Sequence, residues 1–303
     1  MLKVRHKNKY LFDLKKGIRR ILYSHEPVLK GYLKAKEIFI KRNSLPYDKD
    51  ALFEKIFIET VSQCNNDCGF CPVPSKGEGS PEGRFMTEGL FAKIMNELAG
   101  LSFKGSVAFY CNNEPLMDRR LPFWVKEARE KLHNNFFYLY TNGTLISLEG
   151  ANQLFETGLN RIIIDNYDDE HRLIPPVQDL MDHAASLKGE VILDYRHKND
   201  YLGNRAGQNP NPGVVLKEPL RLRCVRPSRE LVVGYDGTVP LCCADGLWKV
   251  RMGNVQETGL KDIWFSGHFK DVRRILWEAD RSVTEICRVC DAVNLSCPKG
   301  ARI

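Results

Sequence analysis

Three closely spaced cysteines are the residues of this chain best suited to chemistry. Cys64, Cys68 and Cys71 follow one another with three and then two intervening residues, and Phe70 precedes the third. Three thiolates from one short loop can hold three irons of a [4Fe–4S] cube, which leaves the fourth iron without a protein ligand. An open coordination position is typical of metal sites that do chemistry, whereas a fully ligated site is structural or carries electrons.

Zinc and disulfides are the alternatives for this loop. Structural zinc usually takes four ligands in paired spacing, whereas the loop offers three ligands in an unpaired pattern and contains no histidine. The segment from Met1 to Lys16 is basic and lacks the apolar core of a secretory signal, so ten cysteines favour a reducing compartment. We therefore predict an iron–sulfur cluster in a cytoplasmic protein.

A second set of cysteines lies toward the end of the chain. Cys224 and Cys242 are separated by seventeen residues, and Cys287 and Cys290 form a Cys-x2-Cys pair. Four cysteines suit zinc as well as an iron–sulfur cluster, so the residues alone leave both open. Cys111 and Cys243 have no assigned role, and Cys297 is an alternate ligand.

The elements that position these residues alternate between strand and helix from Phe53 onward. Strands are predicted at 56–60, 106–110, 136–140, 161–165 and 190–195. Helices are predicted at 87–98, 121–132, 148–157 and 177–187. This alternation predicts an α/β fold, a partial (β/α)6 TIM-like barrel whose active residues gather at the carboxyl ends of the strands. The cysteine loop directly follows the first strand, in agreement with that rule.

The region after the barrel has a different pattern. Asp236-Gly237 is a strong hairpin signal between the apolar runs 229–235 and 238–241, and helices are predicted at 260–265 and 269–279. We expect a small β-hairpin plus helix domain here. The expected domains are a basic helical extension over 1–50, the barrel over 51–218 and the cysteine-containing domain over 219–303.

The extension carries the positive charge of the chain. The net charge is +7, yet residues 1–43 alone hold thirteen Lys or Arg against three Asp or Glu. Apolar residues at helical spacing over 11–22 predict a helix. It would pack on the main domain, rest on an anionic membrane surface or bind an anionic partner. Nucleic acid is not expected, because no binding module accompanies the charge, and no apolar run is long enough to cross a bilayer.

The cysteine loop and the turns after later strands resemble the radical S-adenosylmethionine (radical SAM) superfamily. Glu114-Pro115 after the second strand is similar to that family's glycine-rich turn ending in Glu-Pro, although Cys111, Asn112 and Asn113 stand where glycines are usual. Thr141-Asn142-Gly143 after the third strand resembles its Thr-Asn-Gly turn. The resemblance implies that SAM binds the open iron and that the reaction begins with a 5′-deoxyadenosyl radical that abstracts hydrogen.

The resemblance also implies roles for particular residues. Glu114 would meet the SAM ammonium, Asp165 and Asn166 the ribose or carboxylate, and Phe70 the adenine or the cluster. Arg205 is a tentative catalytic residue, because a guanidinium binds carboxylates with two hydrogen bonds. The full set expected to bind the cofactor is Phe70, Glu114, Pro115, Thr141, Asn142, Asp165, Asn166 and Arg205.

The second cysteine set resembles the Twitch form of the SPASM domain found in radical SAM enzymes. That likeness implies one auxiliary [4Fe–4S] cluster, which is fully ligated and transfers electrons. Its ligands would be Cys224, Cys242, Cys287 and Cys290. In its motifs the chain most resembles the branch of the superfamily that contains the dehydrogenases of aminoglycoside biosynthesis.

The predicted function is therefore that of a radical SAM oxidoreductase. Its substrate would be an alcohol or amino-alcohol carbon of a small sugar-like or cyclitol-like molecule, and its reductant a flavodoxin or ferredoxin-type protein. Two alternatives are a maturase that crosslinks, epimerises or oxidises a ribosomal peptide, and a noncatalytic iron–sulfur or zinc protein. No spacing selects the proton acceptor among Arg205, Tyr110, Asp194 and Tyr195.

Overall fold

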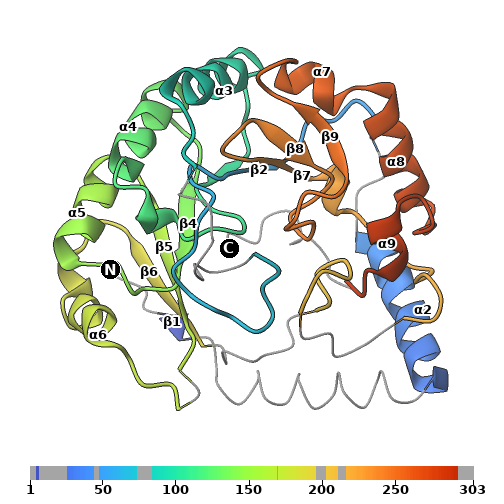
Figure 1. The fold of residues 1–303 in the computed structure, drawn as a ribbon, viewed down its shortest axis with the longest axis horizontal. Helices are drawn as coiled ribbons and strands as arrows, with labels where there is room; N and C mark the ends of the chain where they lie inside the picture. The colour runs from blue at the N-terminus through green and yellow to red at the C-terminus, as the bar shows by residue number, and fades with distance from the viewer. Residues whose placement is uncertain are drawn as a thin grey trace.

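The computed structural model describes residues 5–6, 26–43, 48–73, 84–168, 170–195, 203–210 and 216–292. A seven-stranded sheet forms its centre, and every hydrogen-bonded pair of neighbouring strands in it is parallel (Figure 1). The order is β1-β6-β5-β4-β3-β2-β7. The strands are β1 (Arg5–His6), β2 (Lys55–Ile58), β3 (Ser106–Ala108), β4 (Phe137–Thr141), β5 (Arg161–Asn166), β6 (Glu190–Tyr195) and β7 (Glu230–Val233).

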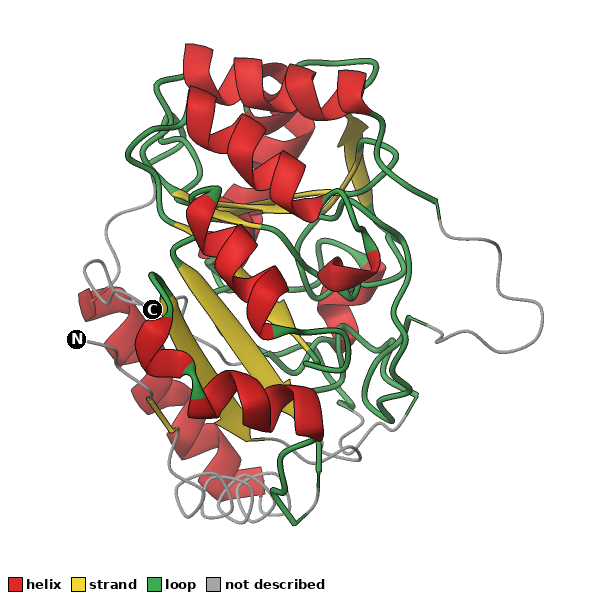
Figure 2. Ribbon diagram, turned by 90° about the vertical axis from the view of Figure 1, so that its left-hand side faces the viewer, coloured by secondary structure: helices red, strands yellow, loops and turns green. Residues whose placement is uncertain are grey.

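Helices cover the outer face of this sheet, as Figures 1 and 2 show from two sides. They are α3 (Glu88–Gly100), α4 (Leu121–Lys131), α5 (Leu148–Glu156) and α6 (Pro175–Asp182). Short 3₁₀ turns lie at η1 (Pro115–Met117), η2 (Ala184–Ser186) and η3 (Arg226–Ser228). The predicted partial barrel with crossover helices is confirmed.

Helix α3 illustrates why these segments fold as predicted. The Thr87 hydroxyl accepts a hydrogen bond from the Leu90 N–H at 3.3 Å, which satisfies one of the free amides of the first turn. Glu88 adds a negative charge at the same end, where the helix dipole favours it. The buried side chains of the helix are the ones its periodicity predicts: Leu90, Phe91, Ile94, Met95 and Leu98.

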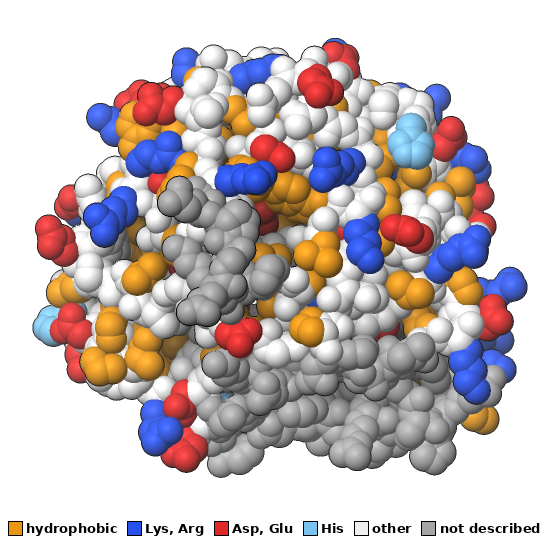
Figure 3. Space-filling view, in the orientation of Figure 1, with side chains coloured by type: hydrophobic (Ala, Val, Ile, Leu, Met, Phe, Trp, Pro, Cys, Tyr) orange, Lys and Arg blue, Asp and Glu red, His pale blue; other side chains and the backbone are white. Residues whose placement is uncertain are grey.

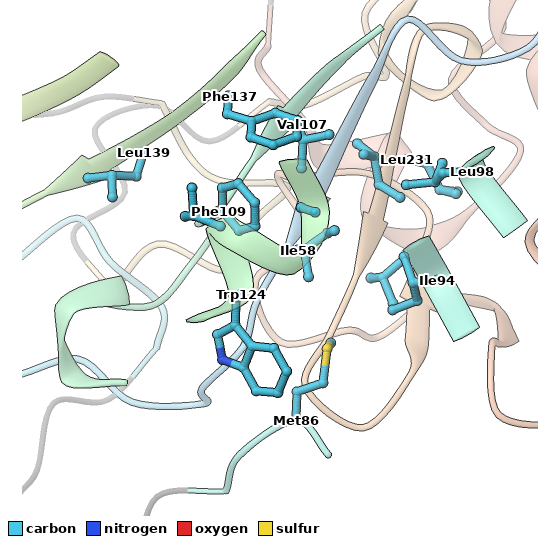
Figure 4. Close-up of a cluster of buried hydrophobic side chains, with 14 of the residues drawn as sticks. Ile58, Met86, Ile94, Leu98, Val107, Phe109, Trp124, Phe137, Leu139 and Leu231 are labelled. Carbon is cyan, nitrogen blue, oxygen red and sulfur yellow. The ribbon is translucent and has the colours of Figure 1, made fainter. Parts of the chain in front are cut away.

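The main core lies between the sheet and these helices (Figure 4). Ile58, Val107 and Phe109 belong to it together with Trp124 of α4, whose indole N–H donates to the Asp118 carboxylate at 2.9 Å. Alternate residues of the same strands face the barrel interior, where they form a second cluster. Its buried members are Phe57, Ala108, Tyr138, Ile163, Ile192 and Val232.

Both edges of the sheet come from segments outside the predicted barrel. Strand β1, from the basic extension, pairs with β6, and β7 pairs with β2 in the register Lys55 to Glu230. The hairpin predicted between 229–235 and 238–241 is therefore wrong in its pairing. β7 has apolar residues on both faces, which suits a buried parallel strand. The antiparallel pair is instead β8 (Thr238–Pro240) with β9 (Arg251–Asn254).

The remaining helices pack around the C-terminal region. α7 (Leu260–Trp264), α8 (Gly267–Trp277) and α9 (Glu285–Val289) follow β9. α2 (Glu26–Asn43) contacts this region through Tyr32 and Leu33, which pack against an apolar cluster, and through an ion pair of Glu37 with Arg223 at 2.5 Å. The helix predicted over 11–22 lies outside the described residues. None of the described helices is long and apolar enough to cross a membrane. Side chains of both charges are interspersed over the described part of the face in Figure 3.

Candidate active site

The carboxyl ends of strands β2 to β5 open onto one cavity of about 490 Å³. All three cysteines of the predicted cluster loop line it, as do residues from the turns after β3, β4 and β5. The described residues of its wall are Cys64, Asn66, Cys68, Phe70, Cys71, Tyr110, Cys111, Asn112, Asn113, Glu114, Tyr140, Thr141, Asn142, Asp165, Tyr167, Arg205 and Arg226. This is the end of the barrel at which active sites form.

The cysteine loop is compact and its thiols face this common space. The Cys71 N–H donates to the Cys68 carbonyl at 2.9 Å, which folds the loop into a turn. Burial, with smaller contributions from the nearby Glu114 and Cys71, raises the pKa of Cys64 to about 11. A thiol in such a setting ionises only with a strong cationic partner, and iron provides one. Three convergent soft donors therefore fit the predicted cluster.

Glu114 joins the ends of two strands. Its carboxylate accepts hydrogen bonds from the Thr141 hydroxyl at 2.7 Å, the Asn142 N–H at 2.8 Å and the Leu116 N–H at 3.1 Å. Burial raises the pKa of Glu114 to about 7, although these three hydrogen bonds favour the charged form. The carboxylate thus holds the turn after β3 against the turn after β4, and it lines the cavity.

The turn after β4 also holds the cysteine loop. The Asn142 amide donates to the Asn65 side-chain oxygen at 2.7 Å, and the Asn65 amide donates to the Thr144 hydroxyl at 2.8 Å. Gly143 has φ +77°, and a Cβ there would lie 2.6 Å from a methyl of Val177. Only glycine suits that conformation and space. The Thr-Asn-Gly turn therefore positions the loop as well as lining the cavity.

The last two residues of β5, Asp165 and Asn166, point to opposite sides of the strand. Asp165 lines the cavity and accepts a hydrogen bond from the Tyr167 hydroxyl at 3.2 Å. The Tyr167 ring lies 5.8 Å from that of Phe70, centroid to centroid. Asn166 does not belong to the cavity wall: its amide donates to the Arg172 carbonyl at 3.1 Å, because adjacent strand residues point in opposite directions. Pro115 is likewise buried at the start of η1 and lies outside the wall.

Arg205 reaches the cavity from the loop that follows β6. Its guanidinium donates to the side-chain oxygen of Asn112, while its Nε is buried without a hydrogen-bond partner. The Asn112 N–H donates in turn to the carboxylate of Glu59, the first residue after β2. Burial raises the pKa of Glu59 to about 7, and the charge of Arg205 opposes that rise. Sequence reasoning missed Glu59, although an acid immediately after the first barrel strand is a usable signal.

Aromatic side chains line the inner side of the cavity. The rings of Tyr110 and Tyr140 are 4.7 Å apart, and burial raises the pKa of Tyr110 well above its ordinary value. Among the four residues considered as proton acceptors, the structure brings Tyr110 and Arg205 to the wall. Asp194 and Tyr195 lie outside it, and the Tyr195 ring stacks on His171 at 4.8 Å.

A second, smaller cavity contains the other cysteine set. Cys224, Cys242, Cys287 and Cys290 all line it, and most of its other described wall residues are apolar. Burial raises the pKa of Cys287 to about 12 and raises that of Cys242 well above its ordinary value. Arg281 lines the same cavity and donates to the carbonyls of Leu222 and Cys290 at 2.9 and 3.2 Å. Cys297 lies outside the described residues.

The placement of these four thiols fits a cluster. Zinc requires its sulfur ligands at about 2.3 Å from one centre, whereas the thiolates of a [4Fe–4S] cube surround a larger group. Four thiols around one cavity meet the second requirement.

Profiles of known families match both parts of the chain. The radical SAM superfamily matches residues 58–183, which include the cysteine loop and the turns after β3, β4 and β5. SPASM, described as an iron-sulfur cluster-binding domain, matches residues 224–291, which contain all four cysteines of the second cavity.

Individual relatives agree with these profiles. The S-adenosyl-L-methionine-dependent 2-deoxy-scyllo-inosamine dehydrogenase of Niallia circulans is 29% identical over 248 residues, which cover 81% of this chain and 96% of that protein. The crystal structure of BtrN in complex with AdoMet and 2-DOIA is 29% identical, has a TM-score of 0.69 and covers 80% of this chain and 95% of that one. The structure of BtrN in an open conformation has a TM-score of 0.60 and is 27% identical; the match covers 80% of this chain and 94% of that one. Native anSMEcpe with bound AdoMet shares the fold, at 17% identity, a TM-score of 0.50 and coverage of 72% and 82%.

Proposed function

The chain belongs to the radical SAM superfamily, and from this membership we propose that it oxidises a hydroxyl-bearing carbon of a small aminocyclitol-like or sugar-like molecule by two electrons. Its cofactors are a SAM-binding [4Fe–4S] cluster, an auxiliary cluster and SAM. When bound, these groups supply two things: a 5′-deoxyadenosyl radical, which removes a hydrogen atom, and an acceptor for the electron that then leaves the substrate.

The observation that carries the proposal is the shared wall of the larger cavity. It brings the three loop cysteines together with Arg205 and Tyr110, and it adjoins the four-thiol cavity at Arg226. A volume of about 490 Å³ is in the ordinary range for small-molecule sites. The relative from Niallia circulans, by its name a dehydrogenase of an amino-substituted cyclitol, supports a substrate of the same class.

The turns around the loop would orient SAM. In the proposal Cys64, Cys68 and Cys71 hold the cluster, while Glu114 and Asn142 fix the turns beside it. Glu114 also presents a carboxylate to the ammonium group of SAM. Asp165 would accept from the ribose hydroxyls, since a carboxylate is an acceptor for two such donors. Phe70 and Tyr167 give the adenine an apolar surface.

Arg205 would act on the oxygen of the substrate. A guanidinium stays protonated at any ordinary pH, so it serves as a fixed cation and cannot accept the proton. Such a cation beside a hydroxyl stabilises the alkoxide that develops as the proton leaves. The side-chain oxygen of Asn112 accepts from the guanidinium, and Glu59 accepts in turn from the Asn112 N–H. We propose this chain of contacts as the support of the reacting oxygen.

Electron supply and location belong to the same proposal. We propose a flavodoxin or ferredoxin-type reductant in the cytoplasm, because the SAM-binding cluster requires one electron at a time. The three explanations for the helix predicted over 11–22 stay predictions, because only the later part of the basic extension is described, where α2 packs on the C-terminal region. Contact of that extension with a membrane surface stays a prediction.

The test uses the chain with both clusters reconstituted anaerobically. It is given SAM, a reductant and a panel of aminocyclitols and sugars carrying deuterium at hydroxyl-bearing carbons. We expect deuterium in 5′-deoxyadenosine and one product that is lighter by two hydrogens for at least one member of the panel. Cys68→Ala is the control and should give neither. Turnover confined to ribosomal peptides, or no SAM cleavage by the loaded wild-type chain, would overturn the proposal.

A further inference from the structure

Arg226 stands in the wall between the two cavities. Among the residues that the structure describes, it alone lines both the cavity of the cysteine loop and that of the four thiols.

Its position is set from both sides. Arg226 follows Cys224 by two residues and begins η3, where the buried Pro227 is next. Its Nη1 donates to the Cys243 sulfur at 2.8 Å, and the Cys243 thiol donates to the Glu230 carboxylate at 3.0 Å. Glu230 is in β7, directly opposite Lys55 of β2, the strand that delivers the cysteine loop. The guanidinium is therefore tied to the barrel, although its backbone belongs to the four-thiol region.

Arg281, the other arginine of the four-thiol cavity, provides a contrast. Its guanidinium donates to three main-chain carbonyls, those of Leu222, Arg223 and Cys290, and so it serves the scaffold. Arg226 makes no such set of main-chain contacts in the described structure; its hydrogen bond goes to a thiol that adjoins Cys242. Arg226 thus lies in the wall that the two cavities share, and its guanidinium is held by a side chain instead of by main-chain carbonyls.

We propose that Arg226 is a positioning residue that stabilises an added electron at the auxiliary site. This inference rests on the proposed function, which sends an electron from the larger cavity to the smaller one. As that electron leaves the substrate radical, the C–O bond of the radical becomes C=O and the hydroxyl proton passes to solvent. The electron reduces the auxiliary cluster by one electron. A fixed positive charge beside a site that gains negative charge raises its reduction potential. Arg226 therefore favours transfer away from the substrate.

The test needs no substrate. A full-length chain with Cys64, Cys68 and Cys71 all changed to Ala retains only the auxiliary site. Its midpoint potential is measured by an EPR-monitored redox titration, with and without Arg226→Met. We expect the methionine variant to lower the equilibrium constant for reduction about tenfold, which is 59 mV for a one-electron couple. Arg226→Lys, which keeps the charge, should stay near the parent value.

Two controls keep the result interpretable. Arg251→Met removes a charge from an exposed position on β9 and should leave the potential unchanged. Iron and sulfide analysis shows whether each variant holds its cluster. If Arg226→Met loses the cluster, Arg226→Gln is titrated in its place. An unchanged potential in the uncharged variants, or loss of the cluster from both of them but not from Arg226→Lys, overturns the proposal. A substrate other than a cyclitol or sugar would contradict the proposed function and leave the proposal for Arg226 standing.

Discussion

The two cysteine sites of this chain are built in opposite ways. The first takes its three thiols from one eight-residue loop at the end of a barrel strand, and polar side chains such as Asn66, Asn112 and Asn142 share its wall. The second takes its four thiols from three separate segments, and its wall is mainly apolar. The first cavity is also much the larger of the two.

This difference matches two tasks. A site that must admit and release a polar molecule needs room and exchangeable hydrogen bonds, whereas a site that holds a permanent group needs closure and a dry wall. The four-thiol site gains its closure from long-range packing, for which η3, β8 and α9 must come together. The loop site instead depends on short-range geometry and on a few amide contacts to the neighbouring turns.

The largest expected effect comes from breaking the first site. Cys64→Ala should abolish SAM cleavage, because two thiolates cannot hold the cube with one iron open. The second site should be unaffected, since its ligands come from other elements. Iron content should fall by about half, and 5′-deoxyadenosine should be absent by chromatography. Retention of full iron content would contradict the role of Cys64 as a ligand, and loss of nearly all the iron would contradict the separation of the two sites.

Breaking the second site should have a different result. Cys242→Ala removes a buried ligand, so the auxiliary cluster should be lost, while the loop site keeps SAM. We expect product formation to fall by at least about 10²-fold, with some 5′-deoxyadenosine still formed. The measurement is the ratio of 5′-deoxyadenosine to oxidised product. Cys297→Ala is the matched control, and a similar loss there would make Cys297 a ligand.

The two sites also differ in how far the sequence predicted them. The loop cysteines, Glu114 and the Thr-Asn-Gly turn are local patterns that follow predicted strands and meet at one cavity, whereas Pro115 was expected at the cofactor and lies outside the wall. Helix α3 is equally local, because its cap and its buried face are both within thirteen residues. Such features depend on spacing, which the chain displays directly.

Long-range pairing was harder to predict. β7 was assigned to a hairpin because Asp236-Gly237 is a strong turn signal, yet its two apolar faces make it a barrel strand beside β2. Asn166 was expected at the cavity, but the alternation of β5 turns it away. Glu59 and Arg226 act through partners more than ten residues distant in sequence, and no spacing pattern reports such contacts.

A subtler effect is expected at Asn112, which stands where the family usually has glycine. Asn112→Gly restores the family residue but removes the acceptor of the Arg205 guanidinium. We expect kcat to fall about tenfold, with a smaller change in KM, because a misplaced cation stabilises the developing alkoxide less. Asn112→Asp keeps the acceptor and should retain most activity. Equal losses of kcat and of bound iron in both variants would point to a structural role alone.

The last effect concerns pH and tests Glu59, which contacts the polar wall through Asn112. The pKa of Glu59 is raised to about 7 from 4.5, so the folded chain binds this proton more tightly than the unfolded chain. Stability contributed by that group is therefore lost as pH rises from about 4.5 through 7, by about 3 kcal/mol in all. Glu59→Gln keeps an acceptor for the Asn112 N–H and removes the charge. In the cluster-free chain, we expect the free energy of unfolding in urea to be equal for this variant and the wild type at pH 4.5 and higher for the variant at pH 8.

The described wall of the four-thiol cavity has no carboxylate, so a variant such as Ala244→Ser should leave the pH dependence unchanged. Parallel pH profiles for Glu59→Gln and the wild type would show that Glu59 titrates normally in the folded chain.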